Sequence, residues 1–174
     1  MTAPIFNGRR VPWNAAWSSE MAYEIRTCRF AAGRKAVWQP HTPGVGEPIF
    51  AKPHNVRQRR AIFEMRCTVC GERTPEDDRW WFKLGAIQDG WFLTTEAPVH
   101  RACADFASKV CPHLRGRDGD LEPFPHGARV ISAIVGGPAV EQDFHIRISP
   151  HETVIGSLKL GWPAGSRLVR SLFA

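Results

Sequence analysis

Two stretches of this sequence decide how the chain folds: CTVCG at Cys67–Gly71 and VHRACADFASKVCPHL at Val99–Leu114. The first carries two cysteines at C-x2-C spacing. The second carries four side chains that can bind a transition metal: His100, Cys103, Cys111 and His113. A tetrahedral zinc site needs four ligands. The pattern therefore raises the question of which two downstream side chains complete the upstream pair.

Helical spacing favours the earlier two downstream residues. A C-x2-C knuckle turns both of its thiolates toward one point, and the first turn of a helix does the same for residues three apart. Three thiolates and one imidazole form a closed ligand set that is typical of a structural site. The sequence predicts that Zn²⁺ is bound by Cys67, Cys70, His100 and Cys103.

The later pair gives a competing ligand set that uses Cys111 or His113. On a helix Cys103 and Cys111 are roughly 80° out of phase and about 12 Å apart along the axis, too far to share one zinc ion. We expect Cys111 to pack as a small buried residue and His113 to cap the last helical carbonyls. Two alternatives stay open at this point: a ligand set that includes Cys111 or His113, and a protein that binds no metal.

The segments around these motifs carry clear turn and helix signals. Asp89-Gly90 divides RWWFKLGAIQDGWFLTTE into a β-hairpin, and Pro98 is suited to the first turn of a helix that Pro112 ends. Upstream, Asn55 is the expected N-cap of a helix that runs to Cys67.

Apolar and alternating runs elsewhere predict strands. We expect a short strand that ends at Trp38, strands over 128–137, 143–149 and 153–162, and a last helical turn over 166–173. Together these elements indicate an α+β protein with one domain over residues 1–174. Its parts are a basic, loop-rich segment with a helix (1–66), a treble-clef-like zinc module of hairpin and helix (67–111) and a β-rich segment (115–174).

The composition limits the class of protein. A hydrophobic content of 43%, with seven Trp and ten Phe, indicates a folded chain. No apolar run is long enough for a transmembrane helix, and the first residues lack the pattern of a secretory signal. These features predict a cytoplasmic protein without a membrane partner, in which the five cysteines serve as thiols and metal ligands rather than disulfides.

The net charge of +6 belongs to the N-terminal third, where residues 1–66 carry eleven Lys and Arg against four Asp and Glu. A basic segment suits a polyanion, since cations neutralise phosphates and aromatic faces stack on bases. The candidate nucleic-acid-binding residues lie on one predicted helix and on a segment before Trp38: Arg57, Arg59, Arg60, Arg66, Arg34 and Lys35. The alternative is a solubilising surface, with the nearby tryptophans in the core.

The order of CTVCG, a hairpin and PVHRACADFASKVCPHL resembles a group of largely uncharacterised zinc-finger-like proteins from actinobacteria and their phages. In that group a Cys often stands where this chain has His100, and the likeness covers about half of the chain. It implies the same four zinc ligands and a phage or prophage origin. The arrangement also resembles the treble-clef group, which includes nucleic-acid binders, protein-binding modules and HNH nucleases.

The sequence favours a non-catalytic binding protein over an enzyme. Its predicted partner is nucleic acid or a host or virion protein, with equal weight, and no motif predicts a small-molecule substrate. The alternative is an HNH-like metal-dependent nuclease, but the predicted hairpin strands carry no general base and four protein ligands leave zinc no open position. A second metal site at His145, His151, Asp143 and Glu152 is weaker than the interpretation that these side chains face solvent.

Overall fold

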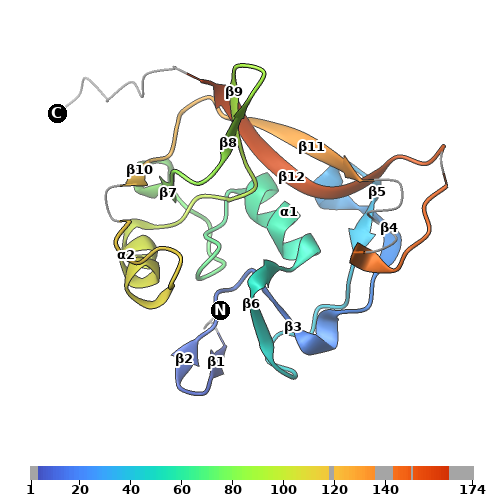
Figure 1. The fold of residues 1–174 in the computed structure, drawn as a ribbon, viewed down its shortest axis with the longest axis horizontal. Coiled ribbons are helices and arrows are strands. Elements are labelled where there is room, and N and C mark those ends of the chain that lie inside the picture. The colour runs from blue at the N-terminus through green and yellow to red at the C-terminus, as the bar shows by residue number, and fades with distance from the viewer. Residues whose placement is uncertain (1–3, 118–119, 136–142, 150, 165–174) are drawn as a thin grey trace.

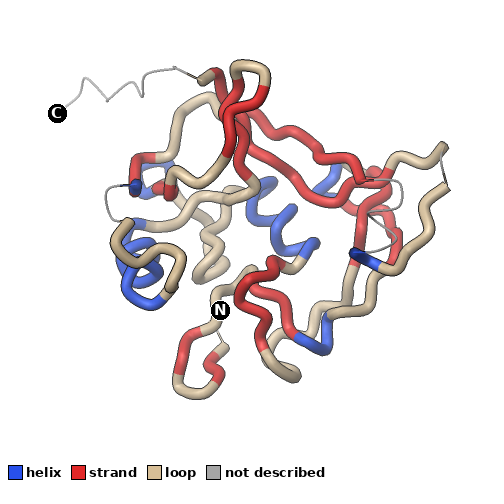
Figure 2. Tube along the Cα trace, in the orientation of Figure 1, coloured by secondary structure: helices blue, strands red, loops and turns tan. Residues whose placement is uncertain are grey.

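The computed structural model describes residues 4–117, 120–135, 143–149 and 151–164, which form an α+β fold (Figures 1 and 2). The helices are α1 (Asn55–Glu64) and α2 (Arg101–Val110), with single 3-10 turns at Ser18–Glu20, Arg29–Ala31 and Glu76–Asp78. The strands are β1 (Ile5–Phe6), β2 (Arg9–Arg10), β3 (Ala15–Trp17), β4 (Glu24–Cys28), β5 (Arg34–Trp38), β6 (Pro48–Pro53), β7 (Trp80–Phe82), β8 (Ala86–Gln88), β9 (Trp91–Thr94), β10 (Leu121–Pro123), β11 (Arg129–Val135) and β12 (Val154–Pro163).

The largest sheet is built around β12, the long strand near the C-terminal end (Figure 1). Strand β11 pairs antiparallel along one edge of β12. Two different strands share the other edge: β5 pairs in parallel at Ile155, and β9 pairs antiparallel over Leu160–Pro163. Strands β4 and β8 extend the sheet beyond β5 and β9. Consequently the edge of β12 is left without a strand partner between these two pairings.

Helix α1 lies at the centre of the molecule and closes that gap with two side chains (Figure 1). Gln58 donates to the carbonyls of Leu158 (2.8 Å) and Thr95 (2.9 Å) and accepts from the Leu158 N–H at 3.1 Å. Arg59, which is completely buried, donates to the carbonyls of Gly156 and Val37. Buried backbone groups need hydrogen-bond partners, and here the helix side chains supply them in place of a strand.

A second buried polar cluster joins α1 to the N-terminal strands. The Arg57 guanidinium donates to both carboxylate oxygens of Glu20, at 2.9 and 2.6 Å, and to the Ala15 carbonyl at 2.6 Å. His54 is the N-cap of α1, because its Nδ1 accepts from the Arg57 N–H at 3.2 Å. Its Nε2 lies 2.7 Å from the Pro40 carbonyl, as expected for a neutral imidazole that donates from Nε2.

This cluster predicts a loss of stability in acid. Burial and the charge of Arg57 lower the pKa of His54 to about 4. Since an unfolded histidine titrates near 6.5, the unfolded chain binds the proton first. The contribution of neutral His54 to the free energy of unfolding is therefore fully present above about pH 6.5. It falls by about 3 kcal/mol as the pH drops toward about 4. We expect urea unfolding between pH 4.5 and 7.5 to show this slope, and His54→Gln to flatten it.

His113→Gln is the matched control, because His113 is exposed. It should leave the pH slope as it is in the wild-type protein. An identical slope in the wild type and in His54→Gln would contradict the assignment of the effect to His54.

Several predicted elements are confirmed. The hairpin turns at Asp89-Gly90, whose φ values of 50° and 76° suit a tight turn between β8 and β9. Helix α2 ends at Val110, with Cys111 as C-cap before Pro112. Strands β5, β11 and β12 occupy three of the four predicted strand regions. The segment over 1–66 is less loop-rich than expected, since it contributes β1–β6.

Other predictions are wrong in detail. Helix α1 begins with His54 as N-cap instead of Asn55 and ends at Glu64, where Met65 adopts a left-handed conformation. Pro98 precedes α2 rather than opening it, because Val99 pairs with Trp80. Residues 143–149 form no strand. Along β12, the next strand in the chain, β11 occupies one edge, and β5, β9 and side chains of α1 occupy the other. The helical turn predicted over 166–173 lies outside the described residues.

The predicted first hairpin strand is divided in two. Its beginning becomes β7, which pairs with β10, and its end becomes β8 in the large sheet. Gly85 lies between them, where a Cβ would come within 2.5 Å of both the Leu93 carbonyl and the Phe92 ring. The close approach of β9 explains why a glycine is needed there. None of the helices in the described part of the chain has the length and apolar character needed to span a membrane.

Candidate metal centre

The C-x2-C knuckle forms a tight loop directly after α1. Its ends are joined by a bridge between Arg66 and Arg73, and the Cys67 N–H donates to the Glu72 carbonyl at 2.8 Å. Gly71 closes the turn by donating to the Cys67 carbonyl at 2.8 Å, with φ at +80°. This backbone geometry directs both thiols of the knuckle toward the start of α2.

Helix α2 is positioned by a short antiparallel bridge before its first turn. The Trp80 N–H donates to the Val99 carbonyl at 2.9 Å and the Val99 N–H donates back at 2.8 Å. His100 follows as the N-cap, and Asp78 accepts from the Arg101 N–H at 2.8 Å. A carboxylate at this position stabilises the helix N-terminus. His100 and Cys103 thus face the knuckle from the first turn.

The four predicted ligand atoms meet at one point. The Sγ atoms of Cys67, Cys70 and Cys103 and a ring nitrogen of His100 all lie within 4.8 Å of one another. His100 Nδ1 is 3.4 Å from the Cys70 sulfur and 3.9 Å from the Cys103 sulfur. Tetrahedral zinc with ordinary bond lengths places sulfur and nitrogen ligands about 3.6 Å apart. The residues therefore fit a tetrahedral metal ion.

The surroundings of the centre suit a closed site. Cys67 is fully buried, and the other three ligands are half-buried. Burial raises the pKa of the Cys67 thiol, although hydrogen bonds from the backbone of Cys70, His100 and Val69 oppose this shift. Burial and the neighbouring thiols also raise the pKa of Cys103. A dication at this point would reverse both shifts, because it stabilises the thiolates.

A hydrogen bond outside the ligand set fixes the orientation of His100. Its Nε2 lies 3.1 Å from the Arg73 carbonyl, which accepts the N–H. The lone pair of the imidazole is then on Nδ1, the nitrogen that faces the cysteines. Ligating histidines in metalloproteins are commonly held by such a bond to a carbonyl. The sequence does not predict this contact, because nothing in it indicates that Arg73 lies beside His100.

The N-terminal segment packs against the knuckle. Backbone N–H groups of Trp13 and Asn14 donate to the carbonyls of Val69 and Thr68, at 3.0 and 3.1 Å. The Trp13 ring covers Gly71 so closely that a Cβ at Gly71 would lie 2.6 Å from two ring atoms. Gly71 therefore has two requirements, the positive φ and the contact with Trp13.

Gly71→Ala should destabilise the protein and weaken metal retention. The matched control is Gly116→Ala, since Gly116 has a similar φ of +78° but nothing within 4 Å of its Cβ position. The control has only the cost of the backbone conformation, about 1 kcal/mol. We expect Gly71→Ala to lower the free energy of unfolding by at least ~2 kcal/mol, because of the added clash. Equal losses in the two variants would contradict a role for the Trp13 contact.

The competing ligand set is not brought together. Cys111 lies at the far end of α2 as its C-cap, and its N–H donates to the Ala107 carbonyl at 2.8 Å. His113 is exposed. The prediction that His113 caps the last carbonyls is not supported, since the Cys111 carbonyl accepts from the backbone of Leu114 and Arg115. Among the described residues, the Cys67 group is the one cluster of His, Cys, Asp or Glu suited to a metal.

The predicted nucleic-acid-binding residues require a correction. Arg57 and Arg59 are only 2% and 0% exposed, and their guanidinium groups bind Glu20 and backbone carbonyls. They cannot contact a phosphate on the surface, so the prediction is wrong for these two. Helical spacing places them on different faces, yet both are buried because strands surround α1.

The remaining candidates lie nearer the surface. Arg60 and Arg66 both donate to Glu64, which reduces the charge that they offer to a polyanion. Lys35 is exposed on β5 and pairs with Glu152, and Arg34 is exposed beside it. The candidate residues therefore do not form one basic face on α1.

Comparison with known proteins adds no relative. No protein-family model matches the chain, and neither does any curated protein or solved structure. The resemblance to zinc-finger-like proteins of actinobacteria and their phages stays a prediction. We therefore infer the function from the geometry of the metal centre and of the surface next to it.

Proposed function

We propose that the centre binds Zn²⁺ and that its role is structural. The observation that supports this most strongly is the convergence of three thiols and one imidazole within 4.8 Å. Thiolate-rich tetrahedral sites select zinc over hard cations such as magnesium or calcium. Four protein ligands also leave no open position for substrate or activated water, which supports a non-catalytic role over the nuclease alternative.

The zinc module is a treble-clef-like arrangement in this proposal. A knuckle gives the first two ligands and the first turn of α2 gives the other two, which is the order that the treble-clef resemblance implies. The chain departs from that group in the middle, because the β8–β9 hairpin belongs to the large sheet. Zinc therefore joins α2 to the rest of the protein as well as stabilising the module.

The biochemical role that we propose is to bind another protein. Two of the predicted phosphate-binding arginines are buried, and two more share Glu64. This charge distribution supports a protein partner over nucleic acid. It is also consistent with an apolar groove beside the metal centre, formed in part by Val69 and Phe106.

Elemental analysis and cobalt substitution test the proposed zinc site. We expect one zinc per chain, and a Co²⁺-substituted protein with the absorption bands of a tetrahedral thiolate site. The Cys103→Ser variant should lose both signals. Plasmid DNA incubated with the zinc-loaded protein should stay intact. Purified protein that holds no zinc and gains none on addition would refute the proposal, and metal-dependent cleavage would favour the nuclease.

A further inference from the structure

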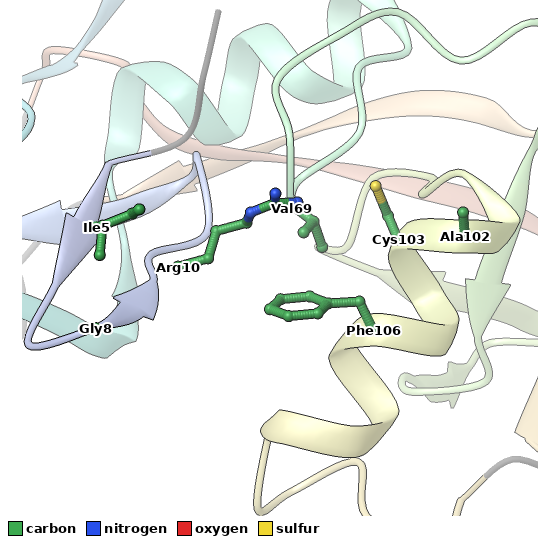
Figure 3. A pocket seen from close by; sticks show the side chains of 7 residues that line it. All are labelled: Ile5, Gly8, Arg10, Val69, Ala102, Cys103 and Phe106. Carbon is green, nitrogen blue, oxygen red and sulfur yellow. The ribbon is translucent and has the colours of Figure 1, made fainter.

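A groove lies between the N-terminal β1–β2 hairpin and helix α2, directly beside the metal centre (Figure 3). Its volume of about 370 Å³ is at the lower end of the range for ligand pockets, ~300–1,000 Å³. That space holds a few side chains rather than a large cofactor. Figure 3 shows Ile5 on one side, Phe106 on the other and Arg10 extending across toward Val69.

The walls of the groove are apolar and partly exposed. Ile5 is 72% exposed, so most of its apolar surface is open to a partner. Ala102 on α2 is exposed, Phe106 on the same helix is half-buried against the apolar cluster around Cys67, and Val69 comes from the knuckle. Apolar side chains that converge on a concave surface favour a ligand with apolar side chains of its own.

The rim of the groove is basic. The Arg10 guanidinium lies 5.5 Å from the centre of the Phe106 ring. Arg9 precedes Arg10 on β2 and is exposed on the opposite face of that strand, away from the groove. Lys109, three residues after Phe106 on α2, is also exposed. Asp105 is the nearest acidic residue on the helix, and it pairs with Arg101. In the part of the chain that the structure describes, no carboxylate pairs with Arg10 or Lys109.

We infer that this groove binds an acidic peptide segment of a partner protein, with one or two bulky apolar side chains against its aliphatic walls beside Arg10. This inference rests on the proposed protein-binding function and names the chemistry of the partner. Nucleic acid fits less well, because Arg10 already covers the Phe106 ring and the other walls are aliphatic. Carboxylates of the peptide pair with the basic rim, while its apolar side chains displace water from the walls.

The metal centre forms part of the groove. Val69 lies within the C-x2-C knuckle, and Cys103 is both a ligand and a lining residue. Peptide binding must therefore depend on the metal, although the peptide does not contact the ion. This dependence separates the groove from any other apolar surface of the protein.

Fluorescence anisotropy with the protein of residues 1–174 tests the inference. The probe is the fluorescein-labelled peptide DDDLFDDD, compared with DDDSSDDD and KKKLFKKK. We expect DDDLFDDD to bind at least ~10-fold more tightly than either comparison peptide, with an affinity that falls as salt increases. Ile5→Ser and Arg10→Glu should each weaken binding about 10-fold or more.

The surface around strands β8 and β11 supplies matched controls. Arg129 lines a second groove and lies 5.6 Å from the Trp91 ring. Ile87 on β8 is 69% exposed and precedes Gln88, which lines that groove. Ile87→Ser and Arg129→Glu therefore repeat the two changes at a different place on the surface. These controls should bind DDDLFDDD like the wild type. Equal losses in both pairs of variants, or tighter binding of a labelled oligothymidine than of DDDLFDDD, would overturn the inference.

Metal content separates this test from that of the proposed zinc site. Protein with one zinc per chain that fails to bind DDDLFDDD refutes the groove and leaves the structural role of zinc intact. Chelated protein that binds the peptide as tightly as the zinc form refutes the dependence on the metal centre. Loss of binding on chelation, with recovery on addition of zinc, is the expected result.

Discussion

Removal of the metal should unfold at least the part of the protein that contains the knuckle and α2. A small apolar cluster around Cys67, Val69 and Phe82 stabilises this region, and a metal ion bound as proposed would supply further free energy. Structural zinc binding contributes about 10–16 kcal/mol to the folding of small zinc domains. We expect a chelator, or Cys67→Ser, to lower the melting temperature by at least ~10 °C.

Thiol titration measures the same event directly. With metal bound, Cys67, Cys70 and Cys103 should resist a thiol reagent, and chelation should make three further thiols reactive. Cys111→Ser is the matched control, because Cys111 is a half-buried cysteine at the opposite end of the same helix. It should keep both the metal and the melting temperature. A melting curve that chelation does not change would contradict a structural metal.

The candidate metal centre is more predictable from the sequence than the rest of the fold. Ligand spacing is local: Cys67 and Cys70 share one turn, and His100 and Cys103 share one helical turn. Short-range geometry decides which of the downstream residues can converge, so helical spacing alone argues against Cys111 as a partner of Cys103. The hairpin turn at Asp89-Gly90 is equally predictable, because its signal lies in two adjacent residues.

The environment of α1 cannot be predicted in this way. Three arginines within four residues suggest a surface helix. Helical spacing puts Arg59 on the apolar face with Val56 and Ile62, but it puts Arg57 on another face and gives no sign that Arg57 points inward. Their burial depends on distant partners: Glu20 for Arg57, and the gap along β12 for Arg59. Pairing between segments about 40 to 100 residues apart leaves no local pattern in the sequence.

Arg57→Met should be among the most destabilising single substitutions in the protein. It leaves the Glu20 carboxylate buried with no cation bound to it, and such changes cost about 3–5 kcal/mol. The buried Ala15 carbonyl also loses its donor. Although burial favours the protonated acid, Arg57 holds the pKa of Glu20 below its ordinary value, so the folded protein carries the charge at neutral pH. Urea unfolding at pH 7 measures the loss.

Arg60→Met is the control on the same helix, since Arg60 pairs with Glu64 at 3.0 Å nearer the surface. It should cost less than about 1 kcal/mol. In the double variant Glu20→Gln/Arg57→Met the uncompensated charge is absent. Its loss of unfolding free energy should therefore be smaller than the sum of the two single losses by about 1–3 kcal/mol.

An Arg57 that bound phosphates would show the opposite pattern: Arg57→Met would keep its stability and lose retention on heparin. The buried ion pair predicts that stability falls, while retention on heparin stays unchanged at temperatures where the variant is folded.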